Sequence, residues 1–271
     1  MKQHSSPLRL KQHWLQFLCL FTATLFMLNA KAQTNSNNKP VYISFTYLKT
    51  APGKYNDYVN LAKTASKKVQ EYQVQQGTQL GWYLYEVLTP TGTQADYNFV
   101  GVNVNTDLQQ LLDPVTSMRE VFQKAAQING QQADSIMQAM GMARSVVKRD
   151  IFLERSSTNE SGPPTKYAEI DFMTPVQGKN ADYAKMEIDK FLPVHKQRMA
   201  MGALKGWRLA QKVMPSATDE PYSYVTANFY ESIDMMLQGK YPEAIKKAWP
   251  TQDMTKLFQT INTVKKEQRN E

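Results

Sequence analysis

The sequence predicts an α+β fold made of two successive units, each with the element order βαββαβ. The main observation is an internal repeat: from residue 42 to residue 103, every position pairs without a gap with the position 125 residues later, and 15 of the 62 pairs are identical. Ordinary composition would give roughly four identities. The two halves are therefore expected to be duplicated domains. Identical pairs include Gly53-Lys54 with Gly178-Lys179, Asp57-Tyr58 with Asp182-Tyr183, and Gly81-Trp82 with Gly206-Trp207.

Alternating apolar residues predict the strands of each unit. Residues 41–49 place Ile43, Phe45 and Tyr47 on one face, and residues 167–173 alternate in the same phase. Side chains alternate across a strand, so this pattern indicates a first strand with one buried face. A strand pair with a long turn follows in each half. These pairs are residues 81–88 with 97–104, and 206–213 with 222–230.

The helices are predicted from their end signals. Asp57 and Asp182 are plausible N-caps, and Gly77 and Gly202 stand at the stop position of the same helices. A second helical region is expected from residue 107 to about 142, broken at "NGQQ", before a closing strand formed by "RSVVKRDIFLE". The resulting order is the ferredoxin-like split βαββαβ arrangement.

The N-terminal segment predicts export. "MKQHSSPLRLKQH" is basic without an acid, "WLQFLCLFTATLFML" is an uncharged apolar run, and Ala30-Lys31-Ala32 has the small residues of a cleavage site. The apolar run is about 15 residues, shorter than the roughly 20 that span a bilayer. We therefore expect a signal peptide and a periplasmic or extracellular protein. The predicted organisation is a signal peptide (1–32), a disordered tail (33–40), a first domain (41–154), a linker (155–166) and a second domain (167–271).

Removal of the signal peptide restricts the available chemistry. The chain's one cysteine is lost with it, and His195 remains as the one histidine. Disulfides, thiolate catalysis and Cys/His zinc sites are then excluded by inventory. The remaining 28 basic and 24 acidic residues give a balance of +4. This charge is too small to indicate a nucleic-acid partner, and no second apolar run approaches membrane length.

With the element order in place, the Gly-Trp that opens the second strand and the tyrosine-rich third strand give each half a resemblance to the dimeric α/β-barrel superfamily. This superfamily includes antibiotic-biosynthesis monooxygenase-like, NIPSNAP-like and EthD-like proteins. Two units in one chain resemble its single-chain pseudodimers, which implies two sheets packed face to face. The resemblance covers residues 41–262, departs at the polar end "NTVKKEQRNE", and implies a fold more than an activity. It leaves open whether the protein also forms a homo-oligomer.

The candidate catalytic residues lie in and just before the stretch "KFLPVHKQRMAMGALKGW": His195 is inside it, and Glu187 is three residues before its start. At 100° per residue, Glu187, His195 and Arg198 lie on or beside the apolar face of the helix, among residues expected to be buried. One interpretation is a polar cluster that lines a cavity, opened by Pro193. The other is a Glu187–Arg198 ion pair that closes the helix onto the sheet. The first half has Ala62, Lys68, Gln70 and Gln73 at the matching positions, so the fold does not require the cluster.

Further residues could contact a ligand. Glu169 and Asp171 alternate on a strand and project to one face, where the first half has Ser44 and Thr46. Each candidate also has a structural interpretation, as a polar strand face or as core packing. The predicted ligand-binding residues are Arg198, Phe191, Trp207, Tyr222, Asn228, Glu169 and Asp171.

Two function classes remain open. The first is an exported binding module that holds a small aromatic or lipid-like molecule in the second domain. It is favoured because one histidine and no cysteine are few residues for catalysis. The second is an oxygenase- or isomerase-like enzyme, without cofactor or with haem. In it His195 would be the general base or an axial haem ligand, oriented by Glu187. The sequence requires no cofactor: it has no glycine-rich phosphate loop and no multi-histidine metal set.

Overall fold

The computed structural model describes residues 39–89, 96–112, 117–158, 165–216, 221–253, 259 and 263–270. Residues 40–271 form one compact unit. The predicted signal peptide and nearly all of the predicted tail lie outside the described residues. Within the described ranges, no helix has both the length and the apolar character that crossing a membrane requires.

Eight strands form one antiparallel sheet in the order β2-β3-β1-β4-β6-β7-β5-β8. The first four strands in this order come from the first half of the chain and the last four from the second. In both halves the two middle strands of the βαββαβ order pair with each other, and the third strand pairs with the first. The strands are β1 (Tyr42–Thr50), β2 (Gly81–Glu86), β3 (Phe99–Asn105), β4 (Arg144–Ser157), β5 (Tyr167–Pro175), β6 (Gly206–Met214), β7 (Tyr224–Tyr230) and β8 (Lys265–Asn270).

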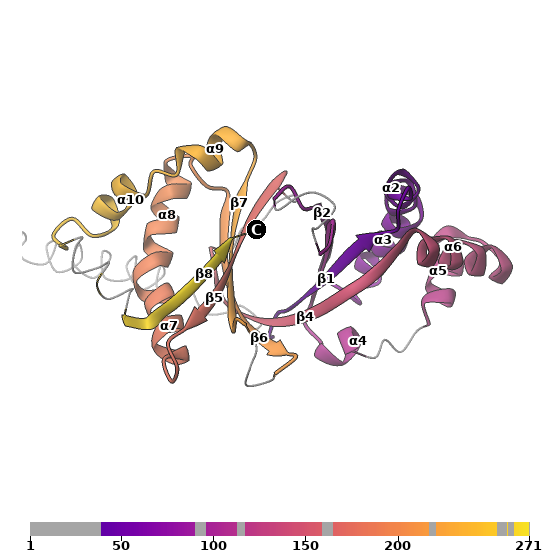
Figure 1. The fold of residues 1–271 in the computed structure, drawn as a ribbon, viewed down its shortest axis with the longest axis horizontal. Helices are drawn as coiled ribbons and strands as arrows, with labels where there is room; N and C mark the ends of the chain where they lie inside the picture. The colour runs from indigo at the N-terminus through magenta and orange to yellow at the C-terminus, as the bar shows by residue number, and fades with distance from the viewer. Residues whose placement is uncertain are drawn as a thin grey trace, which may run out of the picture. The chain divides into compact units, whose positions relative to one another are not determined.

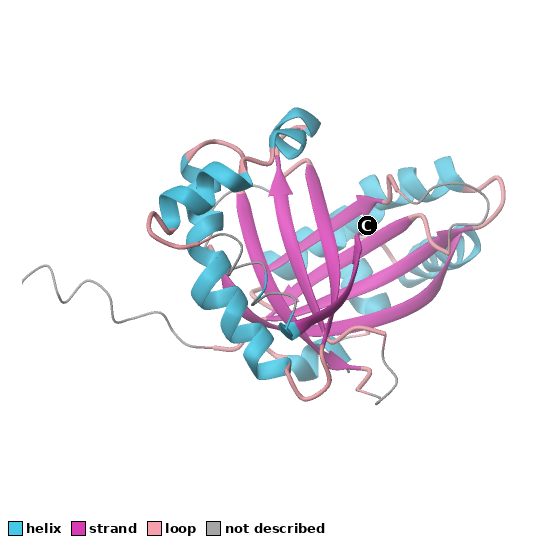
Figure 2. Cartoon of the chain, turned by 60° about the vertical axis from the view of Figure 1, so that its left-hand side comes forward, coloured by secondary structure: helices cyan, strands magenta, loops and turns pink. Residues whose placement is uncertain are grey.

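The helices lie outside the curled sheet, those of the first half on one side and those of the second half on the other (Figures 1 and 2). We call the helix-covered side of the sheet its outer face and the side turned toward the other half its inner face. The first-half helices are α2 (Tyr55–Leu61), the π-helix η1 (Ala62–Ser66), α3 (Lys67–Gln75), α4 (Leu108–Leu112), α5 (Met118–Ala126) and α6 (Gly130–Ala143). Those of the second half are α7 (Asn180–Met186), the π-helix η2 (Glu187–Phe191), α8 (Leu192–Ala200), α9 (Ile233–Gln238) and α10 (Tyr241–Ala248).

The 125-residue offset of the sequence repeat recurs in the structure. α2, η1, α3 and β3 begin and end 125 residues before α7, η2, α8 and β7. Strand register agrees as well: Trp82 lies opposite Asn103, and Trp207 lies opposite Asn228. Both halves even contain a π-helical turn at the same place in the long helix. The repeated residues therefore form the same local structure twice.

Several helix predictions are confirmed and one is corrected. Gly77 and Gly202 have φ of 70° and 69°, the left-handed conformation expected after a helix end. Asp57 and Asp182 are not N-caps, because the helices begin two residues earlier; each carboxylate instead accepts a 2.8 Å hydrogen bond from Lys54 or Lys179. Pro193 is the second residue of α8, directly after η2, where a missing N–H costs little.

The prediction of two separate sheets is wrong. β4 pairs with β6 from Ile151–Met214 to Ser157–Arg208, which joins the halves into a continuous sheet. β4 extends to Ser157, three residues past the predicted end of the first domain. The long strand curls (Figure 1), and the inner faces of the two halves still turn toward each other. The predicted departure at the chain's end is milder than expected, since the six-residue strand β8 pairs with β5 through five residue pairs.

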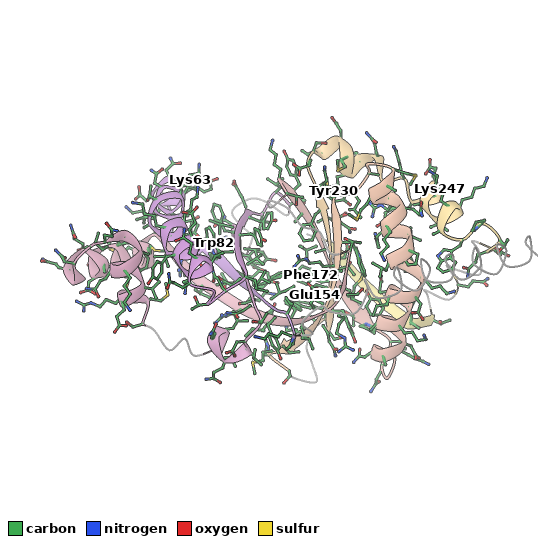
Figure 3. The ribbon with its side chains drawn as sticks, turned by 180° about the vertical axis from the view of Figure 1, so that it is seen from behind. Lys63, Trp82, Glu154, Phe172, Tyr230 and Lys247 are labelled. Atoms are coloured by element: carbon green, nitrogen blue, oxygen red, sulfur yellow. The ribbon has the colours of Figure 1, made fainter. Side chains whose placement is uncertain are left out.

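Apolar cores lie on both faces of the sheet. On the outer face of the second half, Tyr183 of α7 packs in one cluster with Leu204 and with Leu209 of β6, and their exposed fractions are 0 to 2%. The inner face has its own cluster, in which Phe45, Phe152 and Phe172 of both halves meet. In Figure 3, Phe172 lies between the halves, whereas Lys63 and Lys247 lie on the outer helices at opposite sides. The sheet therefore has one apolar core under the helices and another between the two halves.

Candidate functional site

A cavity of about 800 Å³ lies between the inner faces of the two halves. Alternate residues of β1, β3 and β7 face it, as the two-residue period of a strand requires. Apolar side chains from both halves make up most of its wall. These include Ile43, Phe45 and Val102 of the first half, and Ile170, Val225 and Ala227 of the second.

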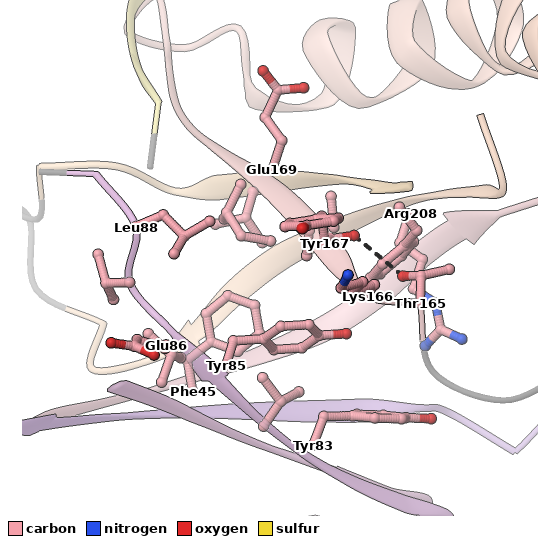
Figure 4. Close-up of a pocket in the computed structure, with 18 of the residues that line it drawn as sticks. Phe45, Tyr83, Tyr85, Glu86, Leu88, Thr165, Lys166, Tyr167, Glu169 and Arg208 are labelled. Carbon is pink, nitrogen blue, oxygen red and sulfur yellow. Dashed lines mark hydrogen bonds between the residues drawn. The ribbon is translucent and has the colours of Figure 1, made fainter. Parts of the chain in front are cut away.

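Polar side chains gather on one side of this cavity. Figure 4 shows Arg208, Lys166 and Thr165 near the hydroxyl ends of Tyr83 and Tyr85. Burial, followed by the nearby Tyr83, raises the pKa of Tyr85 to about 12, although Thr165 and the charge of Arg208 act in the opposite direction. Tyr85 therefore keeps its proton at neutral pH and is a hydrogen-bond donor. We call Tyr83, Tyr85, Thr165 and Arg208 the polar end of the cavity.

The rim of the cavity contains exposed apolar side chains. Leu88, after β2, is 59% exposed, and Ile233, on α9, is 45% exposed; both also line the cavity. Glu86 lies beside Leu88 in Figure 4 and accepts a 2.8 Å hydrogen bond from the Tyr55 hydroxyl. An apolar molecule entering the cavity would meet apolar groups from its first contact.

A second polar cluster lies on the outer face, between the long helix and the sheet of the second half. Its centre is Arg198, which is fully buried. The guanidinium donates to the Gly239 carbonyl at 2.9 Å, to the Tyr230 hydroxyl at 3.2 Å and to Asn228 Oδ1 at 3.3 Å. It also lies 3.8 Å from the centre of the Tyr241 ring. We call Arg198, His195, Asn228, Tyr230 and Glu169 the Arg198 cluster.

His195 belongs to this cluster and does not line the cavity. Its ring stacks on Trp207 with 4.8 Å between centroids, and Nδ1 lies 3.3 Å from Arg198 Nη1. Arginine can only donate, so Nδ1 accepts and the ring is neutral. Burial, followed by the charge of Arg198, lowers the pKa of His195 to about 3. An unperturbed histidine titrates near pH 6.5, whereas this ring stays neutral at pH 7.

One acidic residue belongs to the cluster and two others lie near it. Glu169 accepts from the Tyr230 hydroxyl at 3.0 Å and points away from the cavity toward the helix (Figure 4). Asp171 accepts from the Thr226 hydroxyl at 3.2 Å. Glu187 is buried in η2, and its charge is the second cause, after burial, of the raised pKa of Tyr183.

The structure thus brings together most of the residues that the sequence singled out. His195, Arg198, Trp207, Asn228 and Glu169 are in direct contact or share a partner. Asp171 and Glu187 are nearby, since both raise the pKa of Tyr241, whose value of about 12 arises first from burial. Phe191 is peripheral, 6.4 Å from the His195 ring. Their assignment to a ligand site stays a prediction.

Tyr222 does not join the cluster. Its hydroxyl donates to Asp150 at 2.5 Å and accepts from Lys148 at 3.0 Å. Lys212 completes this group with an ion pair of 2.9 Å to Asp150, both side chains being at most 5% exposed. Asp150 lies on β4 and Lys212 on β6, so the pair fastens the two halves to each other. Sequence reasoning missed it because its members are far apart in the chain.

The polar end of the cavity was also missed. Tyr83, Tyr85 and Arg208 lie on second strands whose alternation looks ordinary, and the sequence does not show which face turns inward. The one available signal was that these side chains lie on the opposite face of their strands from Trp82 and Trp207. Among the described residues, no group of three or more His, Cys, Asp or Glu side chains is arranged to hold a metal ion.

Comparison with known proteins supports the fold alone. No protein-family model and no curated protein matches the sequence. A solved structure of a candidate monooxygenase from Fusobacterium nucleatum is similar, with a TM-score of 0.50 and 10% identity over 87% of this chain and 91% of that one. A haem-binding protein from Thermus thermophilus has a TM-score of 0.43 at 9% identity, covering 85% and 90% of the two chains. The likeness to the Fusobacterium structure shows that the chain has a ferredoxin-type α+β fold.

Proposed function

We propose that the protein binds a small, largely apolar molecule in the cavity between its two halves. The observation that carries this proposal is the cavity itself, about 800 Å³ in volume and walled mainly by apolar and aromatic side chains. This size and lining are typical of sites for small organic ligands. The sequence predicted a ligand within the second domain, whereas the cavity takes its wall from both halves.

We also propose that the halves are two copies of one unit, arranged as a single-chain pseudodimer. The equal offsets of helix ends and strand registers support this reading, as does the shared cavity between the inner faces. Duplication explains why matching strand positions line opposite walls: Val102 and Ala227 are 125 residues apart, and both face the cavity. The predicted domain limits and the homo-oligomer remain untested predictions.

An enzyme that uses His195 receives less support. A ring with a pKa of about 3 is a weak base, and it lies on the outer face, away from the cavity. Haem ligation at His195 does not fit, because the ring is only 3% exposed and is stacked on Trp207. A haem iron there would have to displace the packed helix. We therefore derive no catalytic step through His195.

Export is proposed on the strength of the N-terminal sequence. The basic start, apolar run and Ala30-Lys31-Ala32 motif support cleavage after Ala32. Expressed with its full sequence in a bacterial host, the protein should be recovered outside the cytoplasm with Gln33 as its first residue. N-terminal sequencing of the purified protein checks this. Retention of residues 1–32 would contradict the proposal.

Filling the cavity should abolish ligand binding. Ala227 faces the cavity from the middle of β7 and is 7% exposed, so Ala227→Phe places a ring inside it. We expect the affinity for N-phenyl-1-naphthylamine, a neutral apolar fluorophore, to fall at least tenfold. Enhanced emission on titration measures the binding.

Ala200→Phe provides the matched control, because Ala200 is an exposed residue at the end of α8. This variant should bind the fluorophore as the wild type does. Circular dichroism melting of both variants separates loss of the cavity from loss of the fold. If folded Ala227→Phe binds as well as the wild type, the cavity is not the binding site.

A further inference from the structure

We infer that the polar end of the cavity holds an anionic oxygen group, so that the ligand is an amphipathic carboxylate whose apolar body fills the rest of the cavity. This inference rests on the proposed function and adds the chemical class of the ligand. An apolar site with a few convergent polar groups fixes a ligand's orientation through those groups. The shared chemistry here is a carboxylate on an apolar body, either a fatty acid or an aromatic acid.

Arg208 supplies the charge. It lines the cavity from β6, and its side chain is 27% exposed. Nη1 lies 3.3 Å from Glu154 of β4, a residue that does not line the cavity. This ion pair ties the side chain to the neighbouring strand. A guanidinium has five N–H donors in a planar fork, so it can serve Glu154 and a second carboxylate together.

Hydroxyl groups lie at the same place. Tyr85 stays protonated, and both Thr165 and Arg208 are close enough to influence its ionisation. The Thr165 hydroxyl donates to the Tyr167 carbonyl at 3.2 Å, and Figure 4 shows it beside Arg208. A carboxylate has two oxygens and about four lone-pair sites. Tyrosine and arginine donors together match that capacity in a partly desolvated place, where charge-assisted hydrogen bonds are strong.

The other charged groups at the cavity do not cancel this preference. Glu86 lies on the other side (Figure 4) and is engaged by Tyr55. Glu169 points to the outer face, where Tyr230 donates to it. Lys205 and Glu231 are exposed residues of opposite sign at the rim, and Lys166 is an exposed cation beside the polar end. Arg208 is therefore the partly buried cation that an entering anion would reach.

The two halves contribute different groups to the polar end. The position that matches Arg208 in the first half is Tyr83, and the position that matches Tyr85 in the second half is Ala210; all four line the cavity. Tyr83 lies at the polar end together with Arg208 (Figure 4), so the second half supplies a cation there and the first half supplies phenol hydroxyls. Polar groups gathered at one end of an apolar cavity give an amphipathic anion a single favourable orientation.

The test compares acids with alcohols of the same carbon skeleton by calorimetric titration at pH 7.5. Dodecanoate against 1-dodecanol represents the lipid source, and 2-naphthoate against 2-naphthol represents the aromatic source. We expect the wild type to bind the acid of at least one pair about tenfold or more tightly than the alcohol, because charge-assisted hydrogen bonds are roughly twice as strong as neutral ones. The pair with the larger ratio of acid to alcohol affinity shows whether the ligand is a fatty acid or an aromatic acid.

Arg208→Gln should remove that ratio while neutral N-phenyl-1-naphthylamine binds within twofold of the wild type. Tyr85→Phe, which keeps the ring, should lower acid binding several-fold and leave alcohol binding unchanged. Arg155→Gln is the matched control, since Arg155 is an exposed cation of β4 that does not line the cavity; it should behave as the wild type.

The outcomes separate the two proposals. Equal binding of acid and alcohol by the wild type overturns the anionic ligand but leaves the apolar cavity intact. Weaker binding of acid, alcohol and neutral fluorophore alike in Arg208→Gln also overturns it, because the residue would then only support the wall. If Arg208→Gln does not fold, Arg208→Lys and Tyr85→Phe test the anionic ligand in its place. Arg208→Lys should then give a ratio of acid to alcohol affinity between that of the wild type and one. Failure of the wild type to bind any of these probes overturns the proposed function as well.

Discussion

Arg198→Leu is expected to lower the free energy of unfolding by about 3–5 kcal/mol, the range found when one partner of a buried charged group is removed. Arg198 is fully buried, and its guanidinium donates to Gly239, Asn228 and Tyr230. Leucine fills similar space but leaves those acceptors without their donor. Urea unfolding at pH 7, followed by circular dichroism, measures the loss.

The expected cost is large because acids lie around the same place. Glu169 is connected to Arg198 through the Tyr230 hydroxyl, and the buried Asp171 and Glu187 are close by. Without the guanidinium, this acidic side of the cluster loses its neighbouring cation. Arg198→Lys should recover part of the stability, since an ammonium keeps the charge but not the planar fork.

Gln73→Leu is the matched control, because Gln73 occupies the corresponding position on α3 of the first half. The change there should stay within about 0.5 kcal/mol, as for most substitutions away from buried polar groups. If Arg198→Leu is instead as stable as the wild type, the Arg198 cluster is not needed for folding. A ligand role for Arg198 would then regain support.

The sequence repeat allowed much of the fold to be predicted, because identical residues at a fixed offset force matching helix ends and matching registers. The joining of the two sheets could not be predicted. It depends on β4 and β6 meeting along their edges, and the last residues of β4, "RSS", have no local preference for a strand. Pairing between strands far apart in sequence leaves no periodic signal in either of them.

The candidate site, too, could be predicted only in part. A helical wheel predicted that Glu187, His195 and Arg198 are buried, since a helix places every third or fourth residue on one face. It could not show that the buried face meets a packed sheet and not an open cavity. The polar end, built by Tyr85 and Arg208 from separate halves, required the curl of the whole sheet. Periodicity identifies which side chains turn inward together, but not what lies opposite them.

The stability of the protein should depend on pH through His195. Its pKa is about 6.5 in an unfolded chain and about 3 in the folded protein. As pH falls below 6.5, the unfolded chain binds a proton that the folded protein does not, so stability falls until about pH 3. At pH 4.5 the pH lies about two units below the pKa of the unfolded chain. The free energy of unfolding is then lower by roughly 2–3 kcal/mol than at pH 7.

His195→Gln should remove this part of the pH dependence. The variant loses the stacking on Trp207 and is expected to be less stable than the wild type at pH 7, by about 1–3 kcal/mol. Between pH 7 and 4.5, however, it should lose about 2–3 kcal/mol less than the wild type does, because glutamine takes up no proton. Urea unfolding of both proteins at the two pH values provides the comparison, and carboxylates that titrate in both cancel from it.

Gln70→His tests whether any histidine at this helix position would have the same effect. Gln70 matches His195 in the first half and is only partly buried. A histidine there is not enclosed beside a buried arginine, so its pKa should stay near 6.5 and add little pH dependence. Equal pH dependence in the wild type and His195→Gln would mean that His195 can be protonated without disturbing the fold. The ring would then be accessible to protons, and its role as a general base would have to be reconsidered.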